Sequence, residues 1–196
     1  MADAAAIYAA LMQGDDAEAP RAVYNLATLR LAEGKMRDGW RLFEARHAVL
    51  GRYSPLPPWD GRGGSECVLI EAEQGAEDFI QFLRFLLVAL ARVPVILQTD
   101  AALHPLIHLH PALDAHLKSG RLRWEGGATA SCGMMSLPHL LQITEPDDTP
   151  YLITNVIAAE RSFRVGLCWR GSSRYRFDAR RSIDPALLAP LLPSPV

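Results

Sequence analysis

Short apolar segments alternate with longer amphipathic ones from residue 67 onward, and this alternation constrains the fold more than any other feature of the sequence. The apolar segment "CVLIEA" precedes "DFIQFLRFLLVALA", in which apolar residues recur at helical spacing, and "PVILQT" comes next. Continuously apolar strands separated by helices are typical of a parallel sheet that is covered on both faces. The pattern predicts an α/β fold with a Rossmann-like, three-layer lobe.

The same pattern continues towards the C-terminus. It predicts helices over residues 101–110 and 136–143, and strands over residues 121–125, 128–135 and 164–169. The chain has 196 residues, of which 49% are hydrophobic, so it is long enough to bury a sizeable core.

A different sequence pattern precedes this lobe. Over residues 22–50 the apolar residues recur at helical spacing, and Gly34 interrupts them, which predicts a helical hairpin. Small residues at Ala27 and Gly39 allow two helices to approach closely. Residues 1–50 are therefore expected to be helical and to pack on the α/β lobe, because one such unit cannot bury its apolar face alone.

Residues 51–66 form a linker rich in proline and glycine, "GRYSPLPPWDGRGGSE". Its Trp59 is expected to pack against the helical segment, since an aromatic side chain between two modules contributes a large buried area.

The charge balance argues against several partner classes. A formal net charge of −2 gives no general attraction to nucleic acid or to an anionic membrane. No apolar run approaches the ~20 residues of a membrane span, and the N-terminus lacks the basic start of a signal peptide. We expect a cytoplasmic protein without a membrane span or nucleic-acid partner.

No metal site is expected. Cys67, Cys132 and Cys168 lack paired metal-ligand spacing, so they are expected to be buried free thiols. His104 and His108 have the i, i+4 spacing of zinc ligands on one helix face, but prolines interrupt that segment.

Four motifs carry a resemblance to a known family: "WDG", "AEQGAEDFIQFLRF", "MMSLP" and "VGLCWRGSSRYRFDARRSI". In this order and spacing, from about residue 22 to the C-terminus, the chain resembles bacterial proteins that join tetratricopeptide repeats to a glycosyltransferase-like domain. That domain is similar to the heptosyltransferase (GT-B) type, in which two Rossmann-like lobes face a cleft. The resemblance implies a tetratricopeptide-like helical hairpin, a first lobe over residues 67–162 and only the start of a second lobe over residues 163–196.

The resemblance implies a nucleotide-sugar-dependent transferase. We expect no cofactor. Since most of the donor lobe has no counterpart, we expect no transferase activity from the 196 residues alone. Two alternatives stay open. The chain is a non-catalytic protein–protein interaction module or subunit of a larger assembly, which binds a protein through its tetratricopeptide-like helices or an uncovered face of the sheet. Otherwise it is a fragment of a longer enzyme, whose second lobe would bind the nucleotide sugar.

Asp78 matches the residue that acts as general base in the family. However, Glu77 replaces a glycine of the related sequences, and a carboxylate there would repel a phosphate. The alternative is that Glu73, Glu77 and Asp78 only cap the next helix and complement its dipole.

Candidate substrate contacts lie on both sides of the cleft that the resemblance implies. Those on the acceptor side are Gln74, Gly75, Ser136 and His139, although Ser136 is also expected to cap the helix that follows it. On the donor side the resemblance implies Trp169, Gly171 and Ser172, and Arg174 belongs to the same loop. Arginines after a strand suit a diphosphate, while a solvated basic loop is an equally good interpretation.

Overall fold

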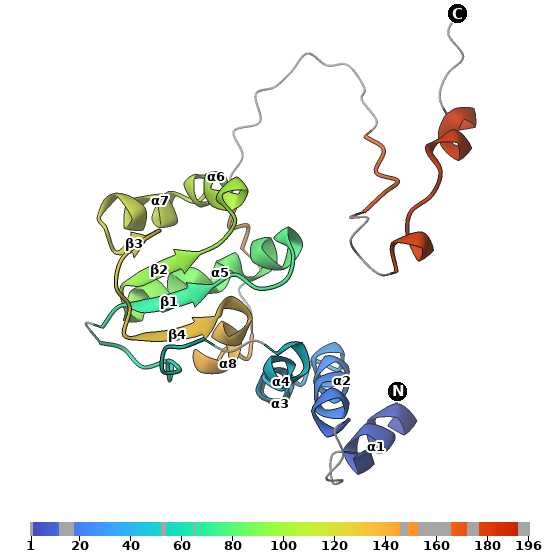
Figure 1. Cartoon of the computed structure of the whole chain (residues 1–196), viewed down its shortest axis with the longest axis horizontal. Helices are drawn as coiled ribbons and strands as arrows, with labels where there is room; N and C mark the ends of the chain where they lie inside the picture. The colour runs from blue at the N-terminus through green and yellow to red at the C-terminus, as the bar shows by residue number, and fades with distance from the viewer. Residues whose placement is uncertain are drawn as a thin grey trace, which may run out of the picture. The chain divides into compact units, whose positions relative to one another are not determined.

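The computed structural model describes residues 2–11, 18–51, 54–64, 66–145, 149–152, 166–171 and 177–191. The chain divides into two compact units, Met1–Thr154 and Asn155–Val196, and each is a separate body. The first unit contains a helical segment and a lobe with a parallel sheet (Figure 1).

The helical segment consists of α1 (Ala2–Leu11), α2 (Ala19–Ala32), α3 (Met36–Phe43) and α4 (Arg46–Leu50). Helices α2 and α3 form the predicted hairpin, and Gly34 adopts a φ of +75° in the turn between them. A Cβ atom on Gly39 would lie 2.6 Å from Leu31 Cδ2, so any larger residue would require Leu31 to move. The helical hairpin is confirmed, and its assignment as a tetratricopeptide repeat stays a prediction.

A chain of aromatic side chains joins the helical segment to the lobe. The Trp40 ring lies edge-on to Phe43, with centroids 5.8 Å apart, and edge-on to Phe82, with centroids 5.7 Å apart. Phe82 belongs to α5 (Ala76–Arg92), the long helix of the lobe. An edge-to-face aromatic pair contributes about 0.5–1.5 kcal/mol of stability beyond that from the surface area it buries. The helices therefore pack on the lobe, as expected.

The sheet of the lobe contains β1 (Val68–Glu71), β2 (Val95–Gln98), β3 (Leu122–Arg123) and β4 (Ala130–Gly133). All pairs are parallel and the strand order is β3-β2-β1-β4. The chain thus builds outward from β1 to β3 and then returns to the other side of β1. This order is that of a Rossmann-like half, and it places a topological switch point between β1 and β4.

One face of the sheet forms the core. Val68, Ile70, Val95 and Leu97 lie in register on this face and are buried, and α5 lies behind the strands in Figure 1. On the opposite face Leu69, Glu71, Gln98 and Arg123 are partly or fully exposed, whereas Ile96 and Ser131 are buried.

The connection that would cover this second face, residues 124–129 between β3 and β4, contains no helix. Within the described residues the lobe therefore has two layers, and the predicted third layer is not found there.

Most strands and helices of the lobe lie where the sequence predicted them, with different limits. The predicted helix over residues 101–110 divides into a 3₁₀ turn (Ala101–Leu103) and α6 (His104–His108). Helix α7 (Pro111–Lys118) was not predicted, because Pro111 was interpreted as a break although it opens the helix. Helix α8 (Leu137–Leu140) comes after β4 and a 3₁₀ turn (Met134–Ser136).

The linker runs along the free edge of β4. The backbone N–H of Trp59 donates to the Ser131 carbonyl at 2.9 Å, and Ser131 donates in turn to Pro57. Trp59 is buried, and its indole N–H donates to the Arg62 carbonyl at 3.0 Å. Its predicted packing against the helical segment stays a prediction.

In the second unit, the described residues form two 3₁₀ segments, Asp178–Arg180 and Pro185–Leu191. Residues 166–169, from the predicted strand 164–169, are exposed and pair with no strand, so the strand prediction is wrong there. Cys168 is consequently exposed rather than buried, while Cys67 and Cys132 are partly buried.

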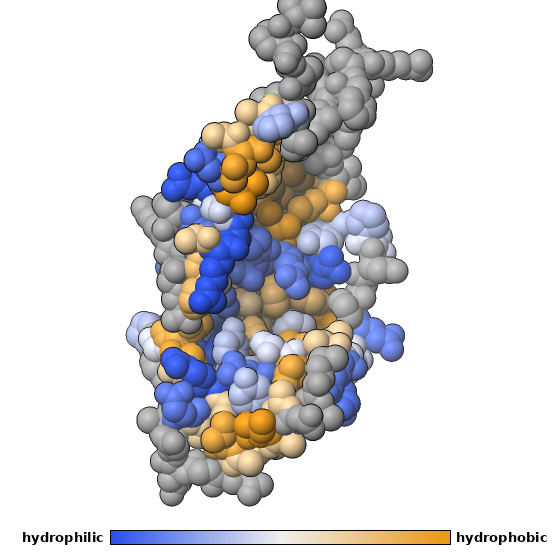
Figure 2. Space-filling view, turned by 90° about the vertical axis from the view of Figure 1, so that its right-hand side faces the viewer, coloured by the Kyte–Doolittle hydropathy of each residue, from blue (hydrophilic) through white to orange (hydrophobic). Residues whose placement is uncertain are grey.

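The face of the molecule shown in Figure 2 mixes hydrophilic and hydrophobic residues in small patches. Among the helices that the structure describes, none is long and apolar enough to cross a membrane.

Candidate functional site

The carboxyl ends of β1 and β4 define the candidate site. Glu73 comes after β1, and Met135 and Ser136 come after β4, on the two sides of the switch point. In open parallel sheets, ligands bind in the crevice outside the carboxyl ends of the strands at such a point. The side chains that occupy this crevice therefore decide what the lobe can bind.

The crevice is filled by Arg46, the first residue of α4. Its side chain is 0% exposed, and its Nε and Nη2 donate to Glu73 Oε1 and Oε2 at 3.2 and 2.8 Å. The same Nη2 also lies 2.7 Å from Ser136 Oγ. The helical segment thus inserts a guanidinium between the two strand ends and holds it with a forked ion pair.

Further groups complete this buried polar network. The Met135 N–H donates to Glu73 Oε2 at 3.0 Å, and Arg46 Nη1 donates to Glu44 Oε1 at 2.7 Å. The Ser136 hydroxyl donates to Glu44 Oε2 at 2.9 Å. Both oxygens of each carboxylate are therefore paired, as buried charges require.

The electrostatics agree with this geometry. Burial alone would lower the pKa of Arg46, but its hydrogen bond to Glu73 and the charges of Glu44 and Glu73 raise that pKa overall. Burial likewise opposes the ionisation of Glu44, yet His47 and Arg46 lower the pKa of Glu44 below its usual value. Arg46 and Glu44 are therefore charged at neutral pH.

The strand-to-helix turn beside the crevice carries the predicted general base. The backbone N–H of Gly75 donates to Asp78 Oδ2 at 3.2 Å, which is half of a capping box at the start of α5. A Cβ atom on Gly75 would lie 2.7 Å from a Glu77 carboxylate oxygen, so the Glu77 side chain folds over the turn. Asp78 thus has the geometry of the capping alternative, whereas Glu73, which that alternative also named, pairs with Arg46 instead.

The acceptor-side residues divide between two places. Gln74 has a positive φ of 60°, and its amide nitrogen lies 3.2 Å from Met135 Sδ, next to the crevice. Ser136 is buried within the polar network, with its hydroxyl fully used. His139 is only partly buried and lines a separate cleft.

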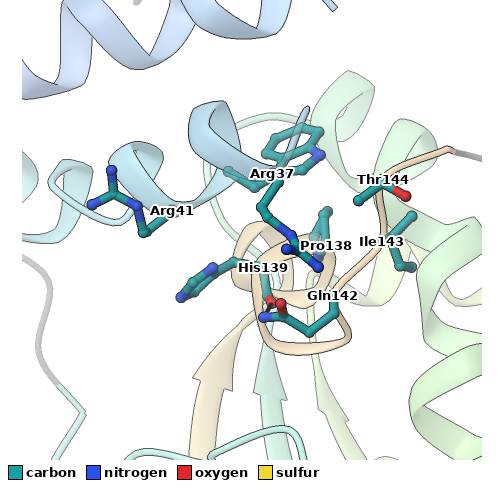
Figure 3. Close-up of a pocket in the computed structure, with 8 residues that line it drawn as sticks. Arg37, Arg41, Pro138, His139, Gln142, Ile143 and Thr144 are labelled. Carbon is teal, nitrogen blue, oxygen red and sulfur yellow. Dashed lines mark hydrogen bonds between the residues drawn. The ribbon is translucent and has the colours of Figure 1, made fainter. Parts of the chain in front are cut away.

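This cleft has a volume of about 220 Å³ and lies between α3 and α8. Figure 3 shows Arg37 reaching from α3 towards Pro138 and Gln142, while Arg41 points away from Arg37 on the side of the cleft where His139 lies. The lining consists of Arg37, Trp40, Arg41, Pro138, His139, Gln142, Ile143 and Thr144. No carboxylate belongs to it.

The donor-side residues belong to the second unit. Trp169 is 39% exposed, and its carbonyl accepts from the Ile183 N–H at 3.0 Å. The Gly171 N–H donates to Ser182 Oγ at 3.2 Å. Ser172 and Arg174 lie outside the described residues, so their predicted contacts stay predictions.

The histidines have other partners. The His104 ring stacks on Trp124 with centroids 3.7 Å apart, and His108 Nδ1 lies 2.6 Å from an Asp114 oxygen. In the part of the chain that the structure describes, no three His, Cys, Asp or Glu side chains gather as metal ligands would.

The sequence did not single out Arg46, Glu44 or Arg37. Each lies in the helical segment, where a charged residue ordinarily faces solvent, and the pairing of Arg46 with Glu73 spans 27 residues. A partial signal was available for Glu73, which is one carboxylate of an acidic run directly after a buried strand.

Searches of known protein families, curated proteins and solved structures gave no match to this chain.

Proposed function

We propose that the chain is a glycosyltransferase-like binding module without transferase activity of its own. The observation that carries the proposal is the buried Arg46–Glu73 pair, which occupies the crevice where a Rossmann-like lobe would hold a ligand.

The ion pair opposes ligand entry energetically. Breaking a buried pair so that one charge is left alone costs about 3–5 kcal/mol. A ligand entering the crevice would have to replace the contacts of Arg46 to both Glu73 and Ser136. Glu77 adds a negative charge over the helix start, which further disfavours a phosphate there.

An assay with the purified protein tests this proposal. We expect no release of nucleoside diphosphate from UDP-, GDP- or ADP-sugars, with or without candidate acceptors, above a protein-free control. Asp78→Asn is the decisive variant, because asparagine keeps an oxygen for the Gly75 N–H but cannot act as a base. Release that Asp78→Asn abolishes and Glu77→Gln retains would overturn the proposal in favour of a transferase with Asp78 as base.

A second candidate function is protein–protein interaction through the helical segment. Ile7 and Leu11, one turn apart on α1, are 61% and 48% exposed. Helical repeats normally cover such a face with the next repeat or with a polar cap. If α1 binds a partner, the doubly substituted Ile7→Ser, Leu11→Ser protein will lose a complex that the wild type retains in size-exclusion chromatography with light scattering. Identical monomer masses for both proteins in cell extract would contradict this candidate.

A further inference from the structure

The cleft between α3 and α8 is lined by two arginines, and the one carboxylate paired with either of them lies outside the lining. Arg37 and Arg41 are one helical turn apart, and like charges at this spacing destabilise a helix. Arg41 has one weak ion pair, with Asp38 at 4.0 Å, and both side chains are more than half exposed. For Arg37, no acidic partner is found among the described residues. The cleft thus presents two guanidinium groups and no carboxylate.

Other lining groups add hydrogen-bond donors. The indole N–H of Trp40 has no acceptor among the residues that the structure describes, and His139 lies across the cleft from α3. The Gln142 amide nitrogen is already used, since it donates to the His139 carbonyl at 2.7 Å. A ligand that suits this lining offers several acceptors and negative charge.

The remaining lining is apolar. The Trp40 ring, Pro138 and Ile143 give the cleft a hydrophobic part beside its charged part. Its volume of about 220 Å³ is below the roughly 300 Å³ at which pockets for drug-sized ligands begin. The space suits a small ring or short chain attached to one charged group.

From this chemistry we infer that the cleft between α3 and α8 binds a small phosphate monoester, with Arg37 on the phosphate, Arg41 adding positive charge at the rim, and Trp40 against the organic body. A phosphate monoester carries about −1.5 to −2 charges at pH 7 and accepts hydrogen bonds at three oxygens, which matches two arginines better than a carboxylate would. The inference does not depend on the closed crevice, because none of the network residues lines the cleft.

Isothermal titration calorimetry tests the inference directly. The probes are glycerol 3-phosphate, glucose 6-phosphate and phenyl phosphate, each compared with its dephosphorylated form and with inorganic phosphate. We expect at least one ester to bind at least tenfold more tightly than both its dephosphorylated form and inorganic phosphate, and added salt to weaken this binding.

Variants locate the binding. Arg37→Gln is expected to weaken binding of the ester at least tenfold, and Arg41→Gln to weaken this binding measurably. Arg62→Gln, on a side chain that is 88% exposed outside the cleft, is the matched control and should bind as the wild type does. Because Arg37 is exposed, its loss leaves the fold intact, which a thermal melt verifies. The inference would be overturned if no ester bound more tightly than its dephosphorylated form and inorganic phosphate. It would also be overturned if Arg37→Gln bound the ester with unchanged affinity.

Discussion

Arg46 and Glu73 form a forked ion pair in which the guanidinium is fully buried and the two nitrogen–oxygen distances are 3.2 and 2.8 Å. Arg46 starts the last helix of the helical segment, and Glu73 comes after the first strand of the lobe. The pair therefore both fills the crevice at the switch point and fastens the helical segment to the sheet.

The first prediction concerns the stability that depends on Arg46. Arg46→Met fills similar space but leaves the buried Glu73 without its counter-ion, so we expect the free energy of unfolding to fall by about 3–5 kcal/mol. Arg62→Met breaks only an exposed pair with Asp60 and should change it by less than about 1 kcal/mol. Urea denaturation of both proteins measures the difference, and equal losses would show that Arg46 has no special role.

The second prediction concerns Gly133, the last residue of β4. A Cβ atom there would overlap the Glu73 carboxylate, which cannot move away because Arg46 and the Met135 N–H hold it. We expect Gly133→Ala to destabilise the protein by about 1–3 kcal/mol. Gly127→Ala, where no atom lies within 4 Å of the added Cβ, should change stability by no more than about 0.5 kcal/mol. Matching thermal melts for the two variants would contradict the placement of Glu73.

The third prediction concerns pH. Folding lowers the pKa of Glu44 from its ordinary value of 4.5, so the unfolded chain binds its proton more readily than the folded chain. The stability from Glu44 is therefore fully present above pH 4.5 and is lost as pH falls through the lower folded pKa. We expect the free energy of unfolding to fall less steeply below pH 4.5 in Glu44→Gln than in the wild type. Parallel curves from denaturant titrations between pH 3 and pH 7 would rule out this role of Glu44.

The fourth prediction separates capping from catalysis at Asp78. Asp78→Ala removes the acceptor of the Gly75 N–H and should cost about 1 kcal/mol, whereas Asp78→Asn retains an acceptor and should cost clearly less. The two free energies of unfolding, measured at neutral pH, test this. Equal and negligible losses would mean that the hydrogen bond does not stabilise α5.

Local sequence patterns were sufficient for the central elements of the lobe. The apolar run around Val68 and the helical spacing of Phe79, Phe82 and Leu86 predicted β1 and α5, because burial selects these patterns directly. Pro111 shows where such reasoning fails: proline ends one helix and opens another equally well, and the sequence alone does not distinguish the two. The segment at Leu167 is apolar enough for a strand, but apolarity does not supply the neighbouring strand that it needs.

The candidate site was predicted only in part. The turn at Gly75 was found because strand, glycine and helix are contiguous in sequence. Arg46 was not found, since its burial depends on the approach of α4 to the ends of β1 and β4, which no local pattern encodes. His139 was predicted as a ligand contact, whereas its neighbours Arg37 and Arg41 come from a helix that the resemblance assigned to a different module.

A double-mutant cycle between Arg46 and Glu73 tests the closed crevice most directly. Arg46→Met, Glu73→Gln and the double variant are compared with the wild type by urea denaturation. The buried ion pair predicts a coupling free energy of about 2 kcal/mol or more between the two positions. If the two single losses in free energy of unfolding sum to the loss of the double variant within about 0.3–0.5 kcal/mol, the ion pair is contradicted, because residues without direct interaction are additive in this way.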